Sequence, residues 1–187
     1  MTTDSTPFAT PPRAMDHDTF MDRLAGVYEH TPWIAQVLWQ RGLDDRHDTV
    51  DGLADAMAEI LNEAADTDKL KLLRAHPELA GKAAVRNELT EDSTGEQAGA
   101  GLDQCTEQEF ERFMALNDQY NARFGFPFIM AVKGYHRTEI LAAFEQRVNN
   151  DYDTEFHTAL HEVNRIARLR LQAICGALAV TAYRSPT

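Results

Sequence analysis

Four short stretches of the sequence carry side chains that could do chemistry, and the first is RAHPELAGKAA at residues 74–84. In this stretch His76 stands directly before Pro77. Proline disfavours helical backbone at the preceding residue, so we expect one helix to end at His76 and another to begin at Pro77. The helix dipole raises the pKa of a histidine at a helix end and burial lowers it, so the group can be tuned to act as an acid or base near neutrality. The alternative is a structural or solvated histidine that only ends a helix.

The second stretch, STGEQAGAGL at residues 93–102, combines polar side chains with glycines. Ser93, Glu96 and Gln97 fall within five residues of each other. Glutamine can donate to and accept from an amide or urea, glutamate can orient or charge an imidazole, and glycines let backbone N–H groups approach a ligand. The alternative is a polar surface loop, which composition alone favours.

The third stretch is RFGFPFIMAVKG at residues 123–134. Its aromatic and β-branched residues favour an extended segment, in which Phe126, Phe128 and Ile129 could line a pocket. The backbone groups of such a segment would be available to a planar ligand. A buried core segment that joins two helices is the alternative.

The fourth stretch, RIARLRL at residues 165–171, places arginines on the last predicted helix. Arg170 borders an apolar stripe formed by Ile166, Leu169 and Ile174, so it is a candidate clamp for a carboxylate. A surface arginine that buries only its aliphatic stem is the alternative.

His157 and His161 on the same helix have the i, i+4 spacing of metal ligands. The sequence supplies no third ligand in an H-E-x-x-H context, so we expect a solvated helix face and no metal site.

These groups must be positioned by secondary-structure elements, and in most of the chain the apolar residues recur at helical spacing. We expect helices over residues 18–30, 32–38, 49–64, 66–76, 106–124, 138–148 and 154–179. The helix at 106–124 carries a capping box, Thr106 with Glu109, and Gly125 should stop it. The sequence shows neither an internal repeat nor a convincing set of strands, which predicts an all-α class: a single compact domain of about eight helices.

The composition excludes several classes of function. The chain has 187 residues, 43% of them hydrophobic and 26% charged, and no apolar run near the roughly 18 residues of a membrane span. A net charge of −12 without a Lys/Arg cluster argues against a nucleic-acid partner. Nucleotide and flavin cofactors have no support, because P-loop and G-x-G-x-x-G motifs are missing. Cys105 and Cys175 form no C-x-x-C pattern, which favours a reducing cytoplasm.

The N-terminal residues 1–16 contain three prolines and no apolar signal sequence. We therefore expect a disordered lead followed by a helical domain at residues 17–183.

Taken together and in this order, RAHPELAGKAA, STGEQAGAGLD, NARFGFPFIMAVKG and RIARLRL resemble the motifs of the 2-oxo-4-hydroxy-4-carboxy-5-ureidoimidazoline (OHCU) decarboxylase family of urate degradation. The resemblance spans nearly the whole chain after the lead. It implies an all-helical fold, a homodimer, a small anionic substrate, and a decarboxylation to (S)-allantoin and CO2 that needs no cofactor.

The resemblance also implies roles for individual residues. His76 would be the catalytic acid or base, with Glu96 beside it. The implied substrate-binding residues are Pro77, Ser93, Gln97, Phe128, Ile129, Met130, Ala131, Val132 and Arg170.

Three other interpretations stay open. The chain could be a helical binding module without turnover, a metal-dependent hydrolase built on His157 and His161, or an enzyme that hydrolyses the preceding intermediate, 5-hydroxyisourate.

Overall fold

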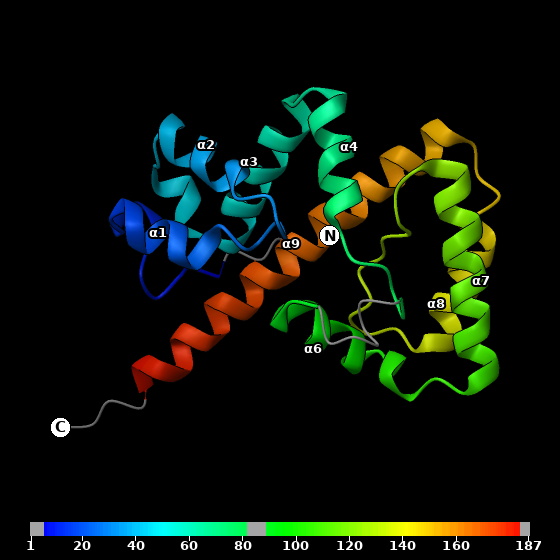
Figure 1. Cartoon of the computed structure of the whole chain (residues 1–187). Helices are drawn as coiled ribbons and strands as arrows, with labels where there is room; N and C mark the ends of the chain where they lie inside the picture. The colour runs from blue at the N-terminus through cyan, green and yellow to red at the C-terminus, as the bar shows by residue number, and fades with distance from the viewer. Residues whose placement is uncertain (1–5, 82–88, 184–187) are drawn as a thin grey trace. The chain divides into compact units, whose positions relative to one another are not determined.

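The structure, a computed structural model, describes residues 6–81 and 89–183, with side chains described as far as residue 176. These ranges contain eight α-helices and no β-strand, so the predicted all-α class is confirmed (Figure 1). The α-helices are α1 (His17–Leu24), α2 (Trp33–Arg41), α3 (Val50–Glu63), α4 (Asp66–Ala75), α6 (Glu91–Gly99), α7 (Glu107–Phe124), α8 (Arg137–Arg147) and α9 (Tyr152–Tyr183). The same ranges contain three short 3₁₀ helices: η1 (Pro12–Ala14) before α1, η2 (Asp45–Asp48) between α2 and α3, and η3 (Leu102–Gln104) between α6 and α7.

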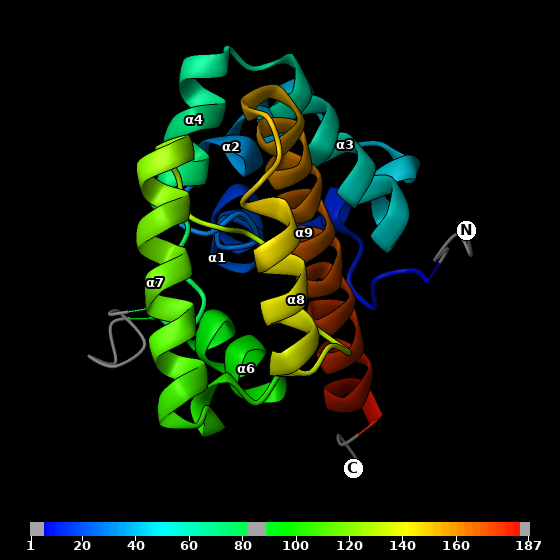
Figure 2. The same ribbon diagram turned by 90° about the vertical axis from the view of Figure 1, so that its right-hand side faces the viewer.

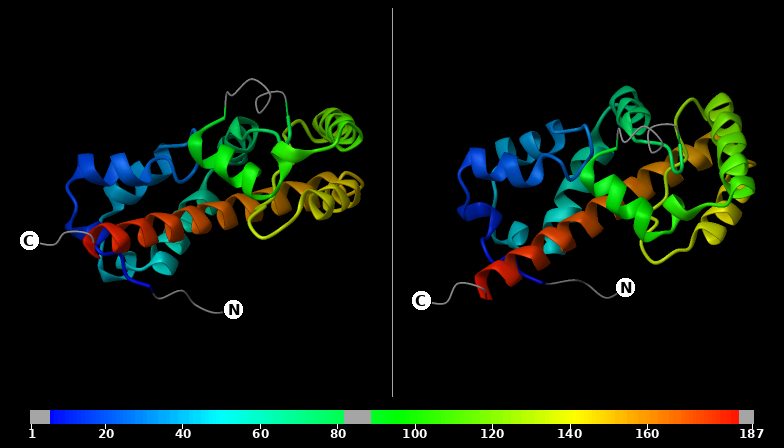
Figure 3. Two further views of the ribbon diagram at one scale, coloured as in Figure 1. Left: turned by 90° about the horizontal axis from the view of Figure 1, so that it is seen from below. Right: turned by 60° about the horizontal axis from the view of Figure 1, so that its bottom comes forward.

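The chain forms two compact units. Unit 1 consists of Met1–Lys69 and Asn164–Thr187, and unit 2 consists of Leu70–Val163. Helix α9 is continuous through the boundary between Val163 and Asn164, so it contributes to both units (Figure 3).

Unit 1 is built on the apolar faces of α1, α2 and α3. The spacing of Leu53, Met57 and Leu61 puts one apolar stripe along α3, and all three side chains are fully buried. The side chain of Thr49 caps this helix by accepting from the N–H of Gly52 at 3.2 Å. Unit 1 also contains Phe20, Leu24 and Ile34 among its fully buried side chains.

Part of the predicted N-terminal lead packs into unit 1. Residues 1–5 lie outside the described residues, but Phe8 is only 4% exposed and its N–H donates to the carbonyl of Asp48 at 3.0 Å. Pro7 forms an isolated β-bridge with Thr49. The prediction of disorder used only the composition of residues 1–16. It did not take account of Phe8, whose apolar side chain anchors this segment.

In unit 2, α7 begins and ends where the sequence predicts. The Thr106 side chain accepts from the N–H of Glu109 at 3.2 Å, and the Glu109 carboxylate accepts from the N–H of Thr106 at 2.9 Å. Gly125 ends the helix with a left-handed backbone at φ 71°. The capping box and the glycine stop are therefore confirmed.

Helices α7 and α8 lie side by side and start next to each other (Figure 2). Arg137 at the start of α8 donates to Glu109 at the start of α7 at 2.9 Å. Further along, the rings of Phe113 and Phe144 pack 6.5 Å apart between the two helices. None of the described helices has the length and apolar character that crossing a membrane requires.

Candidate active site

His76 lies at the predicted break. Helix α4 ends at Ala75, one residue before His76, because Pro77 disfavours continuation of the helix. The imidazole is half-buried, and its Nδ1 lies 3.3 Å from the carbonyl oxygen of Pro77. The side chain therefore leaves a helix end, as expected, and does not lie on a helix face.

The helix predicted to begin at Pro77 does not form through Gly81, and that prediction is wrong. Residues 77–81 make a turn instead, in which Ala80 adopts a left-handed backbone at φ 48°. A left-handed non-glycine residue costs roughly 1–2 kcal/mol, so contacts around the turn must stabilise it. A Cβ at Gly81 would lie 2.5 Å from the Cβ of Glu78, so the turn also requires glycine there.

Two side-chain amides hold the backbone of this turn. Gln97 from α6 accepts from the N–H of Ala80 at 3.0 Å and donates to the carbonyl of Glu78 at 3.2 Å. Asn117 from α7 donates to the carbonyl of Leu79 at 3.0 Å. We call Gln97 and Asn117 the amide clamp.

The amide clamp supplies hydrogen-bond partners to backbone groups of buried residues. Leu79 and Ala80 are 5% and 3% exposed, and buried backbone groups need partners. A further amide, that of Asn121, donates to the side chain of Glu78 at 2.6 Å. The turn that follows His76 is thus bound by side chains from two helices.

Asn117 stands in an otherwise apolar stripe of α7. It follows Phe113 and precedes Tyr120 and Phe124 at three- and four-residue spacing, and it is 1% exposed. A carbonyl can only accept a hydrogen bond. The NH2 group of Asn117 therefore faces the Leu79 carbonyl, and the Oδ1 atom of Asn117 points away from it. Within the part of the chain that the structure describes, this Oδ1 has no hydrogen-bond partner, which costs about 1–3 kcal/mol.

The stretch containing Ser93, Glu96 and Gln97 forms α6. Thr90 caps this helix by accepting from the N–H of Ser93 at 3.3 Å. Ser93 and Gln97, one turn apart, are both buried, whereas Glu96 is half-buried. The Gln97 hydrogen bonds to the turn bring α6 against the segment that carries His76.

The segment Phe128–Val132 is irregular and buried, and three of its backbone groups have protein partners. The carbonyl of Val132 accepts from the N–H of Tyr135 at 3.0 Å. The carbonyl of Ile129 accepts from Arg147 Nη1 at 2.8 Å. The N–H of Ala131 donates to the carboxylate of Glu162 at 2.8 Å. These three groups anchor the segment, so any ligand contact that they make is additional to those bonds.

A buried polar network lies behind this segment. Glu155, which is 0% exposed, accepts from Arg147 at 2.5 and 2.8 Å, from Asn150 at 2.8 Å and from the hydroxyl of Tyr120. Burial, followed by the Glu155 carboxylate, raises the pKa of the Tyr120 phenol well above its usual value, so the hydroxyl remains a donor. The Arg147 guanidinium also lies over the Phe128 ring, 4.4 Å from its centroid.

Arg170 belongs to unit 1. Its side chain is 5% exposed and donates to Glu29 Oε2 at 3.2 Å. The neighbouring Arg168 pairs with Asp51 and Asp55 of the same unit. Arg170 is thus a buried arginine paired with a carboxylate, not the snorkelling surface residue that was its alternative.

Sequence reasoning missed Asn117, Glu155 and Glu162. A detectable signal existed for each, because all three occupy positions of an apolar helical stripe where a polar side chain must find a buried partner. That partner could not be named without the fold.

His157 and His161 do not gain further ligands. Their Nδ1 atoms lie 2.7 Å from the Asp153 carbonyl and 3.6 Å from a Glu162 oxygen. No group of three metal-ligating side chains exists among the described residues.

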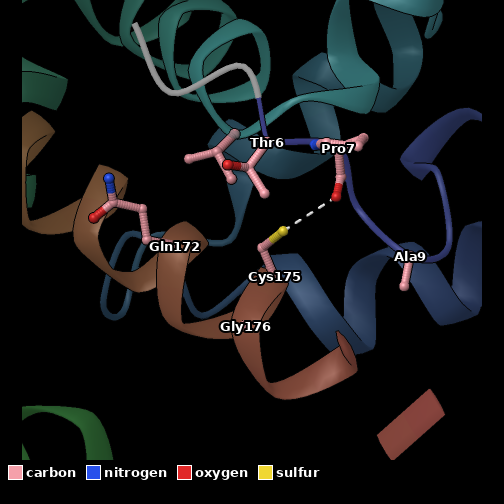
Figure 4. A pocket seen from close by; sticks show the side chains of 7 residues that line it. Thr6, Pro7, Ala9, Gln172, Cys175 and Gly176 are labelled. Atoms are coloured by element: carbon pink, nitrogen blue, oxygen red, sulfur yellow. Dashed lines mark hydrogen bonds between the residues drawn. The ribbon is translucent and has the colours of Figure 1, made fainter. Parts of the chain in front are cut away.

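A pocket of about 270 Å³ lies in unit 1, and none of the residues predicted for the site lines it (Figure 4). It is lined by Thr6, Pro7, Ala9, Val50, Gln172, Cys175 and Gly176. The Cys175 thiol donates to the Pro7 carbonyl at 3.3 Å. The volume of this pocket falls below the roughly 300–1,000 Å³ of common small-molecule sites, so we assign the pocket no function.

Fold and site together define an all-helical protein with a histidine at a helix end, on a turn held by side-chain amides. A family model described as OHCU decarboxylase matches residues 13–172. The chain belongs to the OHCU decarboxylase family.

Similar proteins agree with this assignment. The 2-oxo-4-hydroxy-4-carboxy-5-ureidoimidazoline decarboxylase of Halalkalicoccus jeotgali is 43% identical over 159 residues, which cover 85% of this chain and 86% of the relative. The protein of the same name from Haloferax volcanii is 44% identical over 158 residues, covering 84% of this chain and 89% of the relative. The crystal structure of an (S)-allantoin synthase has a TM-score of 0.69 and 31% identity, covering 87% of this chain and 52% of that one.

Proposed function

We propose that the protein decarboxylates 2-oxo-4-hydroxy-4-carboxy-5-ureidoimidazoline to (S)-allantoin and CO2 in urate degradation. The observation that carries this proposal is the match of nearly the whole chain to decarboxylases of that name, at up to 44% identity. The His76 turn, held by Gln97 of α6, supports it from the side of the structure.

The chemistry needs an electron sink and a proton, and the substrate itself can supply the sink. When the bond to the carboxylate breaks, CO2 leaves and the electron pair stays on the ring carbon. The adjacent C=N–C=O system of the substrate delocalises that pair, so no cofactor is required. A proton then completes allantoin.

We assign the proton transfer to His76. Two transfers are open to it: removal of the 4-hydroxyl proton before CO2 leaves, or delivery of a proton to one face of the carbanion. The half-buried imidazole directly after α4 suits either step, because part of it is exposed and can reach a ligand.

The other proposed roles follow the family motifs. Within unit 2, we propose that the backbone of Phe128–Val132 orients the anion and that Ser93, Glu96 and Gln97, with Pro77, contact the ureido group and the ring. For Arg170, a role in binding the anion is carried over from the family motifs alone. Gln97 holds the turn with its oxygen and one N–H, so its second N–H is the one proposed for the substrate.

The test is circular dichroism of the allantoin formed when urate oxidase and hydroxyisourate hydrolase generate the unstable substrate in situ. We expect rapid accumulation of the (S) enantiomer, unchanged by EDTA. Loss of activity with EDTA would favour the hydrolase interpretation based on His157 and His161. Slow racemic product, equal to that without the protein, would reject the decarboxylase and leave a binding module.

We also propose that the protein is a cytoplasmic homodimer. The dimer is carried over from the family resemblance, and the compartment from the cysteine usage. Light scattering coupled to size exclusion should give about twice the 21.0 kDa mass of the chain, and a mass equal to one chain would contradict the dimer.

A further inference from the structure

The backbone of the turn after His76 is held by side chains from outside the turn. This backbone takes three hydrogen bonds from the amide clamp, two with Gln97 and one with Asn117. Ala80 is held in a left-handed conformation, which an unrestrained chain would leave. The clamp therefore determines where the chain runs immediately after His76.

Asn117 makes only one of the hydrogen bonds that its buried amide could make. Nδ2 donates to the Leu79 carbonyl, while Oδ1 finds no partner among the described residues. A leucine or valine in the stripe between Phe113 and Tyr120 would avoid the unpaired Oδ1, but it would leave the buried Leu79 carbonyl without its donor. Asn117 therefore leaves one of its own buried atoms unpaired while it pairs the carbonyl of the turn, which marks this contact as the role of its side chain.

We propose that Asn117 is a positioning residue for the decarboxylation: by holding the Leu79 carbonyl it fixes the turn and so the direction of the His76 imidazole. This inference rests on the proposed role of His76. Leu79 is three residues from His76, with the rigid Pro77 between them, so a shift of the turn moves the imidazole. Misplacing a reacting group by about 1 Å can lower a rate by about 10²-fold.

The test compares Asn117→Ala and Asn117→Leu with a control, Phe113→Leu. The control opens space in the same helix one turn away, at a side chain that is 0% exposed and has no bond to the turn. For each variant kcat, KM and the urea unfolding midpoint are measured. We expect both Asn117 variants to lose about 10- to 100-fold in kcat with little change in KM, and Phe113→Leu to keep kcat despite lower stability.

A double-mutant cycle shows whether Asn117 acts through His76. In the His76→Ala background, Asn117→Ala should leave the residual rate unchanged, because there is no imidazole left to position. An equal fold-loss in both backgrounds, or a kcat loss matched by Phe113→Leu, would overturn the inference.

The cycle also separates this inference from the proposed function. An inactive His76→Ala with Asn117→Ala and Asn117→Leu at wild-type kcat would reject the positioning role alone. His76→Ala at wild-type turnover would reject both.

Discussion

Replacing His76 by alanine should lower kcat by about 10²- to 10⁴-fold, the usual contribution of a positioned acid or base. The side chain stands at the end of α4, and the clamp of Gln97 and Asn117 fixes the turn that follows it. The enzyme would retain whatever rate the remaining site supplies by binding and orienting the substrate.

The matched control is His157→Ala. His157 is an exposed histidine on α9, and its Nδ1 bonds to the Asp153 carbonyl in its own helix. We expect this variant to keep wild-type kcat. Both variants should unfold at nearly the wild-type urea concentration, because neither side chain is fully buried. A His76→Ala enzyme within a factor of about two of wild type would remove His76 from the mechanism.

Replacing Arg147 by methionine should lower the free energy of unfolding by about 3–5 kcal/mol. Arg147 is 13% exposed in its side chain and pairs with Glu155, which is 0% exposed. Methionine preserves much of the aliphatic stem but leaves the carboxylate buried without its cation. The variant also takes a donor from the carbonyl of Ile129, so the anchored segment loses one of its bonds.

An exposed pair in the same unit provides the comparison. Arg112 of α7 pairs with Glu145 of α8 at 2.8 Å, and both side chains are about half exposed, at 52% and 48%. Arg112→Met should therefore cost only about 0–1 kcal/mol. Urea unfolding of both variants measures the difference. Equal losses of unfolding free energy would mean that the hydrogen bonds from Tyr120 and Asn150 alone are enough to stabilise the buried Glu155 carboxylate.

The elements that local signals define could be predicted from the sequence. Thr106 and Glu109 start α7, Gly125 ends it, and Pro77 ends α4 near His76. Each signal acts over a few residues, through a cap, a left-handed glycine or a proline ring, so it needs no knowledge of the fold. The family resemblance added the candidate site residues to this outline.

The turn after His76 could not be predicted in the same way. Pro77 is a typical first residue of a helix, and the sequence pointed to one. What stabilises the turn instead are amides 17 to 38 positions away in the chain, Gln97 for Ala80 and Asn117 for Leu79. A partner at that distance becomes visible only when α6 and α7 are in place.

Unit 1 is interrupted in sequence by the whole of unit 2, and this has a consequence for the order in which the chain can fold during synthesis. The bond from Tyr28 to Asn164 spans 136 positions, and that from Glu29 to Arg170 spans 141. Unit 2, by contrast, has all of its residues once Val163 has been added. A growing chain can therefore complete unit 2 first. Unit 1, with α1, α2 and α3, stays incomplete until the rest of α9 has been synthesised. Closing such long loops is slow, so the late arrival of α9 is expected to set the final step of folding.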